Sequence, residues 1–116
     1  MELGIHTEKR GDNIAVVSLS GEVDVYSSPR VRSAMLEQLD GGSKYLVMDL
    51  SKVDYLDSSG LGILVAGLKR SRENGGEVFL VNPKPRIQHV LEVTGLHNVF
   101  TILKSVDEAV ARAERN

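Results

Sequence analysis

The residues with the most chemical potential form one short stretch, Asp57-Ser58-Ser59-Gly60, directly before an apolar helical pattern. Serine and aspartate are common at helix starts because their side-chain oxygens accept hydrogen bonds from the first free backbone N–H groups. A hydroxyl there also faces the positive end of the helix dipole, which favours an added anion. The stretch therefore indicates either a simple helix cap or a serine that another enzyme modifies.

Strands and helices are predicted to alternate around this stretch. Apolar runs bounded by turn residues predict strands at residues 3–8, 14–19, 45–50, 78–81 and 99–103. Helical spacing of apolar residues predicts helices between them, the second at 59–74 and the third at 86–93. The order β-β-α-β-α-β-α-β-α is typical of an α/β domain with helices packed on a mixed, largely parallel sheet of about five strands. We expect one such domain over residues 1–116.

Turn and capping residues mark the ends of several elements. Gly11-Asp12-Asn13 predicts a hairpin between the first two strands. Ser28 is the expected cap of the first helix, because Pro29 suits the position that follows a cap. Ser105 and Glu108 form a capping-box pattern, which predicts the start of the last helix.

The second helix is expected to have two different faces. Its core face follows the 3.6-residue period at Leu61, Leu64, Val65 and Leu68. Gly62 and Ala66 fall elsewhere and would leave a shallow surface that suits a partner's side chains, with Lys69 and Arg70 at its rim. The alternative is that these small residues simply pack closely on a neighbouring helix.

Composition excludes several classes of protein. The 116 residues contain no cysteine, so disulfides, thiolate metal sites and cysteine nucleophiles are excluded. The net charge of -2 lacks the basic excess of nucleic-acid binders. No apolar run approaches the ~20 residues of a membrane helix, and the N-terminus has no signal-peptide core. We expect a soluble, cytoplasmic protein without direct contact with nucleic acid or membrane.

Few other side chains are candidates for catalysis. His6, His89 and His97 do not form an H-x-x-x-H metal-binding pattern, and the G-x-S-x-G motif of serine hydrolases is absent. We therefore predict no enzymatic activity and no cofactor. Tyr26 and Tyr55 are expected to be half-buried packing residues, although Tyr26 has the alternative of lining a partner surface.

The chain resembles the STAS-domain anti-sigma factor antagonists over about residues 5–111. Four blocks in the same order carry the resemblance: Gly21 to Tyr26 followed by Ser28-Pro29, the stretch DYLDSSGLGILV, Gly75-Gly76, and Val93-Thr94-Gly95-Leu96. Several blocks in one order are far more specific than any one of them alone.

This resemblance implies roles for residues around the serine pair. The family's phosphoacceptor is the serine directly after the aspartate, which is Ser58 here, and Ser59 is the less favoured acceptor. Asp24 matches an acidic position that binds the partner kinase in the family. Together with the helix pattern, the resemblance predicts a partner-binding surface formed by Asp24, Tyr26, Asp57, Ser59, Gly60, Gly62 and Ala66.

The resemblance also implies a cycle of partner switching. The unphosphorylated protein would bind an anti-sigma factor that is a serine kinase and so release a sigma factor for transcription. The kinase would use its own ATP and Mg²⁺ to phosphorylate Ser58, and a serine phosphatase would remove the phosphate again. The protein itself is expected to be a monomer. Because a phosphate adds about -1.5 to -2 charge beside carboxylates, we expect a local electrostatic or steric switch without refolding.

Three other functions remain open at this point. The leading alternative is a STAS subunit of a transporter or larger signalling assembly that acts as a constitutive binding module. The intact DSSG stretch and the absence of flanking sequence favour the free antagonist. A small serine hydrolase has only lone serines and histidines in its favour, and nucleotide binding lacks a phosphate loop.

Overall fold

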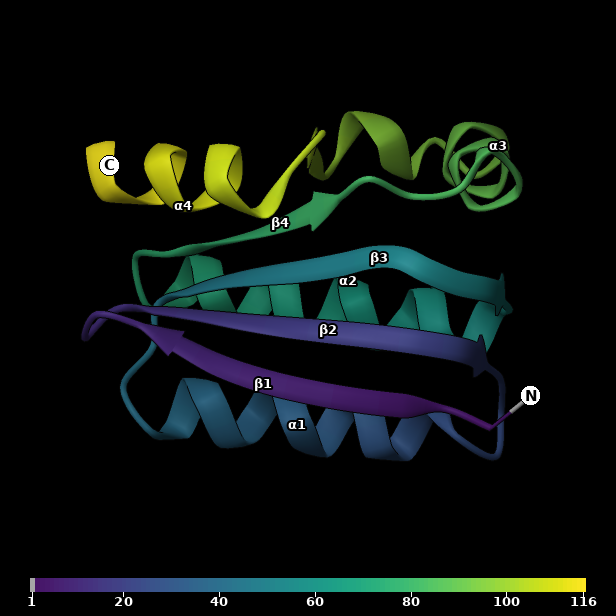
Figure 1. Ribbon diagram of the computed structural model, residues 1–116, viewed down its shortest axis with the longest axis horizontal. Coiled ribbons are helices and arrows are strands. Elements are labelled where there is room, and N and C mark those ends of the chain that lie inside the picture. The colour runs from purple at the N-terminus through teal and green to yellow at the C-terminus, as the bar shows by residue number, and fades with distance from the viewer. Residues whose placement is uncertain (1) are drawn as a thin grey trace.

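The computed structural model describes residues 2–116. Its centre is a mixed sheet of five strands (Figure 1). The strands lie side by side in sequence order, with β1 antiparallel to β2 and every other pair parallel. Their bounds are Gly4–Arg10 for β1, Ile14–Val23 for β2, Tyr45–Leu56 for β3, Glu77–Val81 for β4 and Thr101–Leu103 for β5. The predicted mixed, largely parallel α/β sheet is therefore confirmed.

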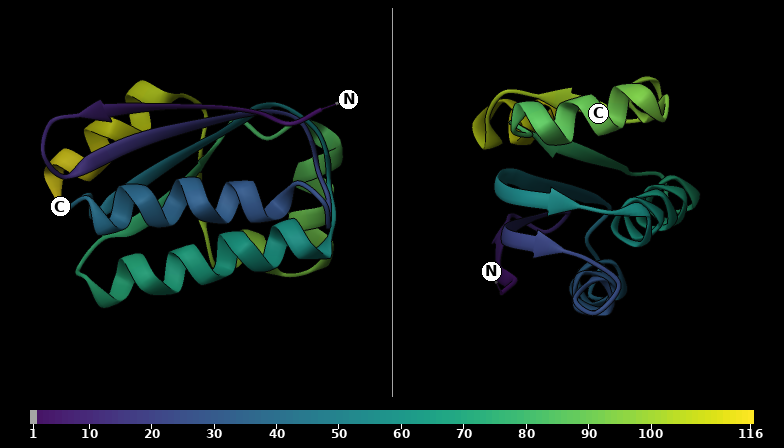
Figure 2. Two further views of the ribbon diagram at one scale, coloured as in Figure 1. Left: turned by 90° about the horizontal axis from the view of Figure 1, so that it is seen from below. Right: turned by 90° about the vertical axis from the view of Figure 1, so that its right-hand side faces the viewer.

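Helices cover both faces of this sheet. Their bounds are Ser28–Asp40 for α1, Ser58–Glu73 for α2, Pro85–Val93 for α3 and Val106–Arg115 for α4, with a short 3-10 turn, η1, at Leu96–Asn98. Helices α1 and α2 run side by side on one face, as Figure 2 shows, and α4 packs on the other. Glu2 and Leu3 lie beside Glu22 and Asp24 at the end of β2, whereas the C-terminus lies at the opposite end of the molecule (Figure 1).

The hydrophobic core is split by the pleat of the sheet. Successive side chains on a strand point to opposite faces. On β3, Leu46 and Met48 therefore join the cluster beneath α1 and α2, whereas Val47 joins the cluster beneath α4. All three are fully buried, as expected of a strand that is covered on both faces.

Some boundaries differ from the sequence-based expectation. Both β2 and β3 continue past their apolar runs, to Val23 and Leu56, because alternating buried and exposed residues extend the ladder after an irregular register near Ser20. Val99 lies outside β5, since its backbone N–H donates to the carbonyl of Leu96 at 2.9 Å and closes η1 instead. The hairpin at residues 11–13 is confirmed.

The predicted cap of the first helix was wrong by one residue. Ser27 is the N-cap of α1, and Ser28 is the first helical residue and is buried. The Ser27 hydroxyl donates to the carbonyl of Glu22 rather than capping the helix, so it organises the turn before α1. At α4, Ser105 does cap the helix, because its hydroxyl accepts from the N–H of Glu108 at 3.1 Å.

Gly60 sets how closely the start of α2 approaches the sheet. A Cβ atom at this position would collide with Cδ1 of Leu56 and lie 2.8 Å from Cγ1 of Val23. Gly62, one half-turn further along, has nothing within 4 Å of such an atom. Gly60 is therefore required by packing, whereas Gly62 faces open space.

Gly60→Ala is expected to lower the free energy of unfolding by about 1–3 kcal/mol, because the added methyl overpacks the ends of β2 and β3. Gly62→Ala is the matched control and should raise that free energy by about 0.5–1 kcal/mol, since alanine favours a helix without meeting any neighbour. Urea unfolding of the two variants measures both values. Equal stability of the two variants would contradict the packing role of Gly60.

Candidate functional site

Strands β2 and β3 end at the same edge of the sheet, and an acidic residue follows each of them. Val23 pairs with Leu56 in the parallel ladder, and Asp24 and Asp57 are the next residues in each chain segment. The backbone N–H of Asp57 donates to the carbonyl of Val23 at 3.2 Å, which ties the two segments together. The predicted site residues of both blocks therefore meet at this edge.

Asp57 holds the start of α2. Its carboxylate oxygen Oδ1 accepts from the backbone N–H groups of Ser59 and Gly60, at 3.0 and 3.2 Å. The same oxygen accepts from the Ser59 hydroxyl at 2.5 Å. The Ser59 hydroxyl, followed by backbone N–H groups that include that of Val25, lowers the pKa of Asp57 against the effect of desolvation. Asp57 is thus an ionised cap at the start of α2.

The two serines differ in what their hydroxyls are free to do. Ser58 is the first residue of α2 and is exposed. Ser59 is half-buried, and its hydroxyl donates to the Asp57 carboxylate. Because a kinase needs an accessible hydroxyl, the local structure distinguishes Ser58 from Ser59.

Asp24 shapes the turn between β2 and α1. Its carboxylate accepts from the backbone N–H groups of Tyr26 and Ser27, at 2.9 and 3.0 Å, while the Ser27 hydroxyl accepts from the N–H of Asp24. This crossed pattern leaves Val25 and Tyr26 at the tip of the turn, 61% and 89% exposed. The expectation that Tyr26 is half-buried was wrong, since the turn directs its side chain away from the core.

Val25 and Ser27 are residues that the sequence interpretation missed. An aspartate followed three residues later by serine is a signal for this kind of side-chain-to-backbone turn. Gly60, which was predicted to contact a partner, is buried, so its methyl-free backbone serves the packing of α2. Tyr55 is also exposed, at 44%, so the expectation that it is half-buried was wrong as well.

Small residues follow Ser58 along the outer face of α2. Ser58, Gly62 and Ala66 are all exposed and follow each other at four-residue spacing, which places them on one face of the helix. The close packing on the neighbouring helix is made by Gly67 instead, beneath the side chain of Met35 in α1. Gly62 and Ala66 therefore remain available at the surface.

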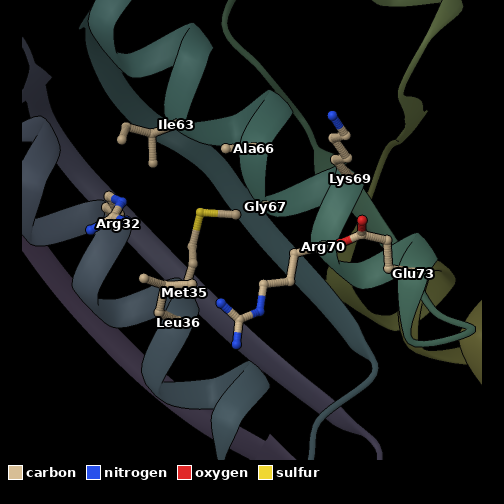
Figure 3. A pocket seen from close by; sticks show the side chains of 9 residues that line it. All are labelled: Arg32, Met35, Leu36, Ile63, Ala66, Gly67, Lys69, Arg70 and Glu73. Carbon is tan, nitrogen blue, oxygen red and sulfur yellow. The ribbon is translucent and has the colours of Figure 1, made fainter.

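This face ends in an open pocket between α1 and α2 (Figure 3). Its apolar side chains come from Met35, Leu36, Ile63 and Ala66. Its charged lining comes from Arg32, Lys69, Arg70 and Glu73. Arg70 is paired across the helices with Asp40 at 2.6 Å, so it also joins α1 to α2. The predicted position of Lys69 and Arg70 beside Ala66 agrees with this pocket.

Residues 2–116 contain neither a membrane-spanning helix nor a cluster of metal-binding side chains. No helix in that part of the chain is both long enough and apolar enough to cross a bilayer. The same residues contain no group of three or more histidine, aspartate or glutamate side chains placed to hold a metal ion.

Comparison with solved structures identifies the fold. An anti-sigma factor antagonist from Mycobacterium paratuberculosis is similar with a TM-score of 0.87 and 28% identity, over 97% of this chain and 95% of that one. SpoIIAA in its unphosphorylated form gives 0.86 with 21% identity, over 97% and 98% of the two chains. The phosphorylated form of SpoIIAA from Bacillus gives 0.76 with 22% identity, over 94% and 98%.

Comparison of sequences identifies the family. The anti-sigma-B factor antagonist of Staphylococcus aureus (strain NCTC 8325 / PS 47) is 31% identical over 102 residues, which are 88% of this chain and 94% of that protein. The family model described as the STAS domain matches residues 6–109, which include Asp24 and the whole of α2. The chain therefore belongs to the STAS domain family, as a relative of bacterial anti-sigma factor antagonists.

Proposed function

We propose that this protein is a cytoplasmic anti-sigma factor antagonist controlled by phosphorylation of Ser58. The unphosphorylated monomer binds an anti-sigma factor that is also a serine kinase, and binding releases a sigma factor. The kinase then phosphorylates Ser58, the complex separates, and a serine phosphatase restores the binding form. The observation that carries the proposal is the exposed Ser58 hydroxyl at the start of α2, beside a Ser59 hydroxyl that Asp57 already holds.

The charge pattern at the edge of the sheet supports a local switch. A phosphate on Ser58 would sit next to the ionised Asp57 carboxylate and on the same edge as Asp24. A partner surface that fits a neutral hydroxyl would then meet a cluster of negative charge, and such like-charge contacts cost several kcal/mol in a desolvated interface. The similarity of this chain to both forms of SpoIIAA is consistent with a switch that keeps the fold.

The first test is phosphate transfer to the purified chain. Incubation with ATP, Mg²⁺ and each anti-sigma kinase of the host is expected to add one phosphate, detected by intact mass and located at Ser58 by fragment mapping. Ser58→Ala should remove the phosphate completely. Ser59→Ala is the matched control and should retain it, because its loss leaves the Ser58 hydroxyl exposed.

A phosphate on Ser59 in the wild-type chain would overturn the assignment of the acceptor. A kinase that binds the chain without phosphorylating it would instead support the leading alternative, a constitutive module within a transporter or signalling assembly. Co-purification with a membrane complex would favour the same alternative.

The second test asks whether the negative charge of Asp57, and not only its acceptor oxygen, stabilises the start of α2. Its folded-state pKa is lowered, so its ionisation stabilises the fold above the ordinary aspartate pKa of about 3.9, and this contribution disappears as pH falls through the lowered value. Asp57→Ala should therefore lower Tm at pH 7, and its gap to wild type should shrink as the pH is lowered to about 3.

Asp57→Asn is the control for this test, because an amide oxygen still accepts from the N–H groups of Ser59 and Gly60 without a charge. Its melting temperature should lie between those of the other two proteins at pH 7. A gap between wild type and Asp57→Ala that stays constant from pH 7 to 3 would show that the carboxylate charge does not stabilise α2.

A further inference from the structure

The face of the sheet that carries α4 is only partly covered by that helix. Ile14 and Val16, in the first half of β2, join the apolar cluster beneath α4. Further along the same strand the side chains on this face become polar, at Ser18 and Ser20. In the part of the chain that the structure describes, no helix lies in front of β1 and this part of β2 (Figure 1). A polar surface therefore takes the place of the core here.

This polar surface is hollowed into an open pocket of about 300 Å³, which we call the β-face pocket. Its polar lining comes from His6 of β1, Ser18 and Ser20 of β2, and Lys52 of β3. The strand register places His6 beside Ser18, and Lys52 beside Ser20. A Cβ atom on Gly4 would lie 2.5 Å from Oγ of Ser20, so the Ser20 hydroxyl occupies space that a side chain at Gly4 would fill.

The main donors of the β-face pocket are not engaged elsewhere in the protein. Within residues 2–116, the side chains of Ser18, Ser20 and Lys52 make no hydrogen bond or ion pair. Both serines are half-buried. Because a hydroxyl that is partly removed from water gains from a new hydrogen-bond partner, these groups favour an external acceptor.

The charge of the β-face pocket favours an anion. Lys52 is a cation in its lining, and no carboxylate lines it. The acidic side chains on the neighbouring parts of the strands are engaged already. Asp49 accepts from the backbone N–H of Ser51 at 3.0 Å, and Glu8 is ion-paired with Arg10. The ligand that suits this pocket therefore carries negative charge and several acceptor oxygens.

The spacing of the donors fits a tetrahedral oxyanion. Side chains that are neighbours across two strands have Cβ atoms about 4.5–5.5 Å apart, and alternate residues along one strand are about 6.6 Å apart. Hydrogen bonds of about 2.8 Å from each side span these separations when the oxygens of one phosphate lie between the donors.

We propose that the β-face pocket binds a small phosphate-type oxyanion, either free or as the end group of a small metabolite. The Lys52 ammonium pairs with its negative charge. The hydroxyls of Ser18 and Ser20 and the imidazole of His6 donate hydrogen bonds to its oxygens. This inference does not depend on the proposed function, because none of these residues belongs to the edge that carries Ser58.

Binding is measured by amide NMR spectra of the full chain, with inorganic phosphate replacing chloride at constant ionic strength. We expect saturable shifts at the residues of the β-face pocket, with a Kd of about 1–10 mM. Lys52→Gln should raise Kd about tenfold, because it removes the charged donor. Lys104→Gln is the matched control and should stay within about twofold of wild type, since Lys104 follows β5 at the opposite edge of the sheet.

The two hydroxyls are tested together in the double variant Ser18→Ala and Ser20→Ala. This variant should raise Kd about 5- to 10-fold, because two donors are lost while the charge of Lys52 remains. Circular dichroism should give similar melting for all variants, since Lys52 and Lys104 are exposed and the serines make no internal hydrogen bond through their side chains.

An equal rise of Kd in the two lysine variants would show diffuse charge attraction and overturn the site, as would shifts that never saturate. A second titration with glycerol 3-phosphate distinguishes the two sources of the anion. Tighter binding than inorganic phosphate would assign the end group of a small metabolite, and weaker binding would assign the free anion. Neither titration involves phosphate transfer to Ser58, so failure here leaves the proposed function intact.

Discussion

The carboxylate of Asp57 is the interaction on which the rest of this site depends. One oxygen accepts from two backbone N–H groups and one hydroxyl at the start of α2, and the carboxylate also interacts with the turn after β2. This arrangement starts the helix at Ser58 and engages the hydroxyl of Ser59. The backbone N–H of Asp57 also joins this start to Val23 at the end of β2. The helix-cap interpretation of the serine stretch is correct for Asp57, and it leaves Ser58 free for a second role.

Some glycines in this fold allow close packing, whereas others lie at the surface. Gly60 lets α2 approach the ends of two strands, and Gly67 makes room for Met35 between α1 and α2. Gly76 lies so close to the carbonyl of Lys44 that no side chain would fit. Gly62, in contrast, borders only solvent. A glycine in this fold is therefore informative only together with the neighbour that it faces.

Much of the fold could be predicted from periodicity, because the buried strands and amphipathic helices have strong patterns. The extensions of β2 and β3 could not, since beyond Leu50 the apolar residues alternate with polar ones and the register shifts. At the site, the serine pair was recognisable from its neighbours in the chain. The exposure of Val25 and Tyr26 was not, because it depends on a turn closed by Ser27. The burial of Gly60 likewise depends on Val23, which is distant in the sequence.

The opposite placement of the two chain ends decides where a label can be attached. Glu2 and Leu3 line the same hollow as Tyr26, whereas Asn116 lies beside the hairpin at residues 11–13, at the far end of the sheet (Figure 1). A fluorophore, affinity tag or tether at the N-terminus would crowd the edge that carries Ser58. The same group at Asn116 would leave that edge clear, so Asn116 is the position by which the chain can be immobilised or visualised while the Ser58 edge stays accessible.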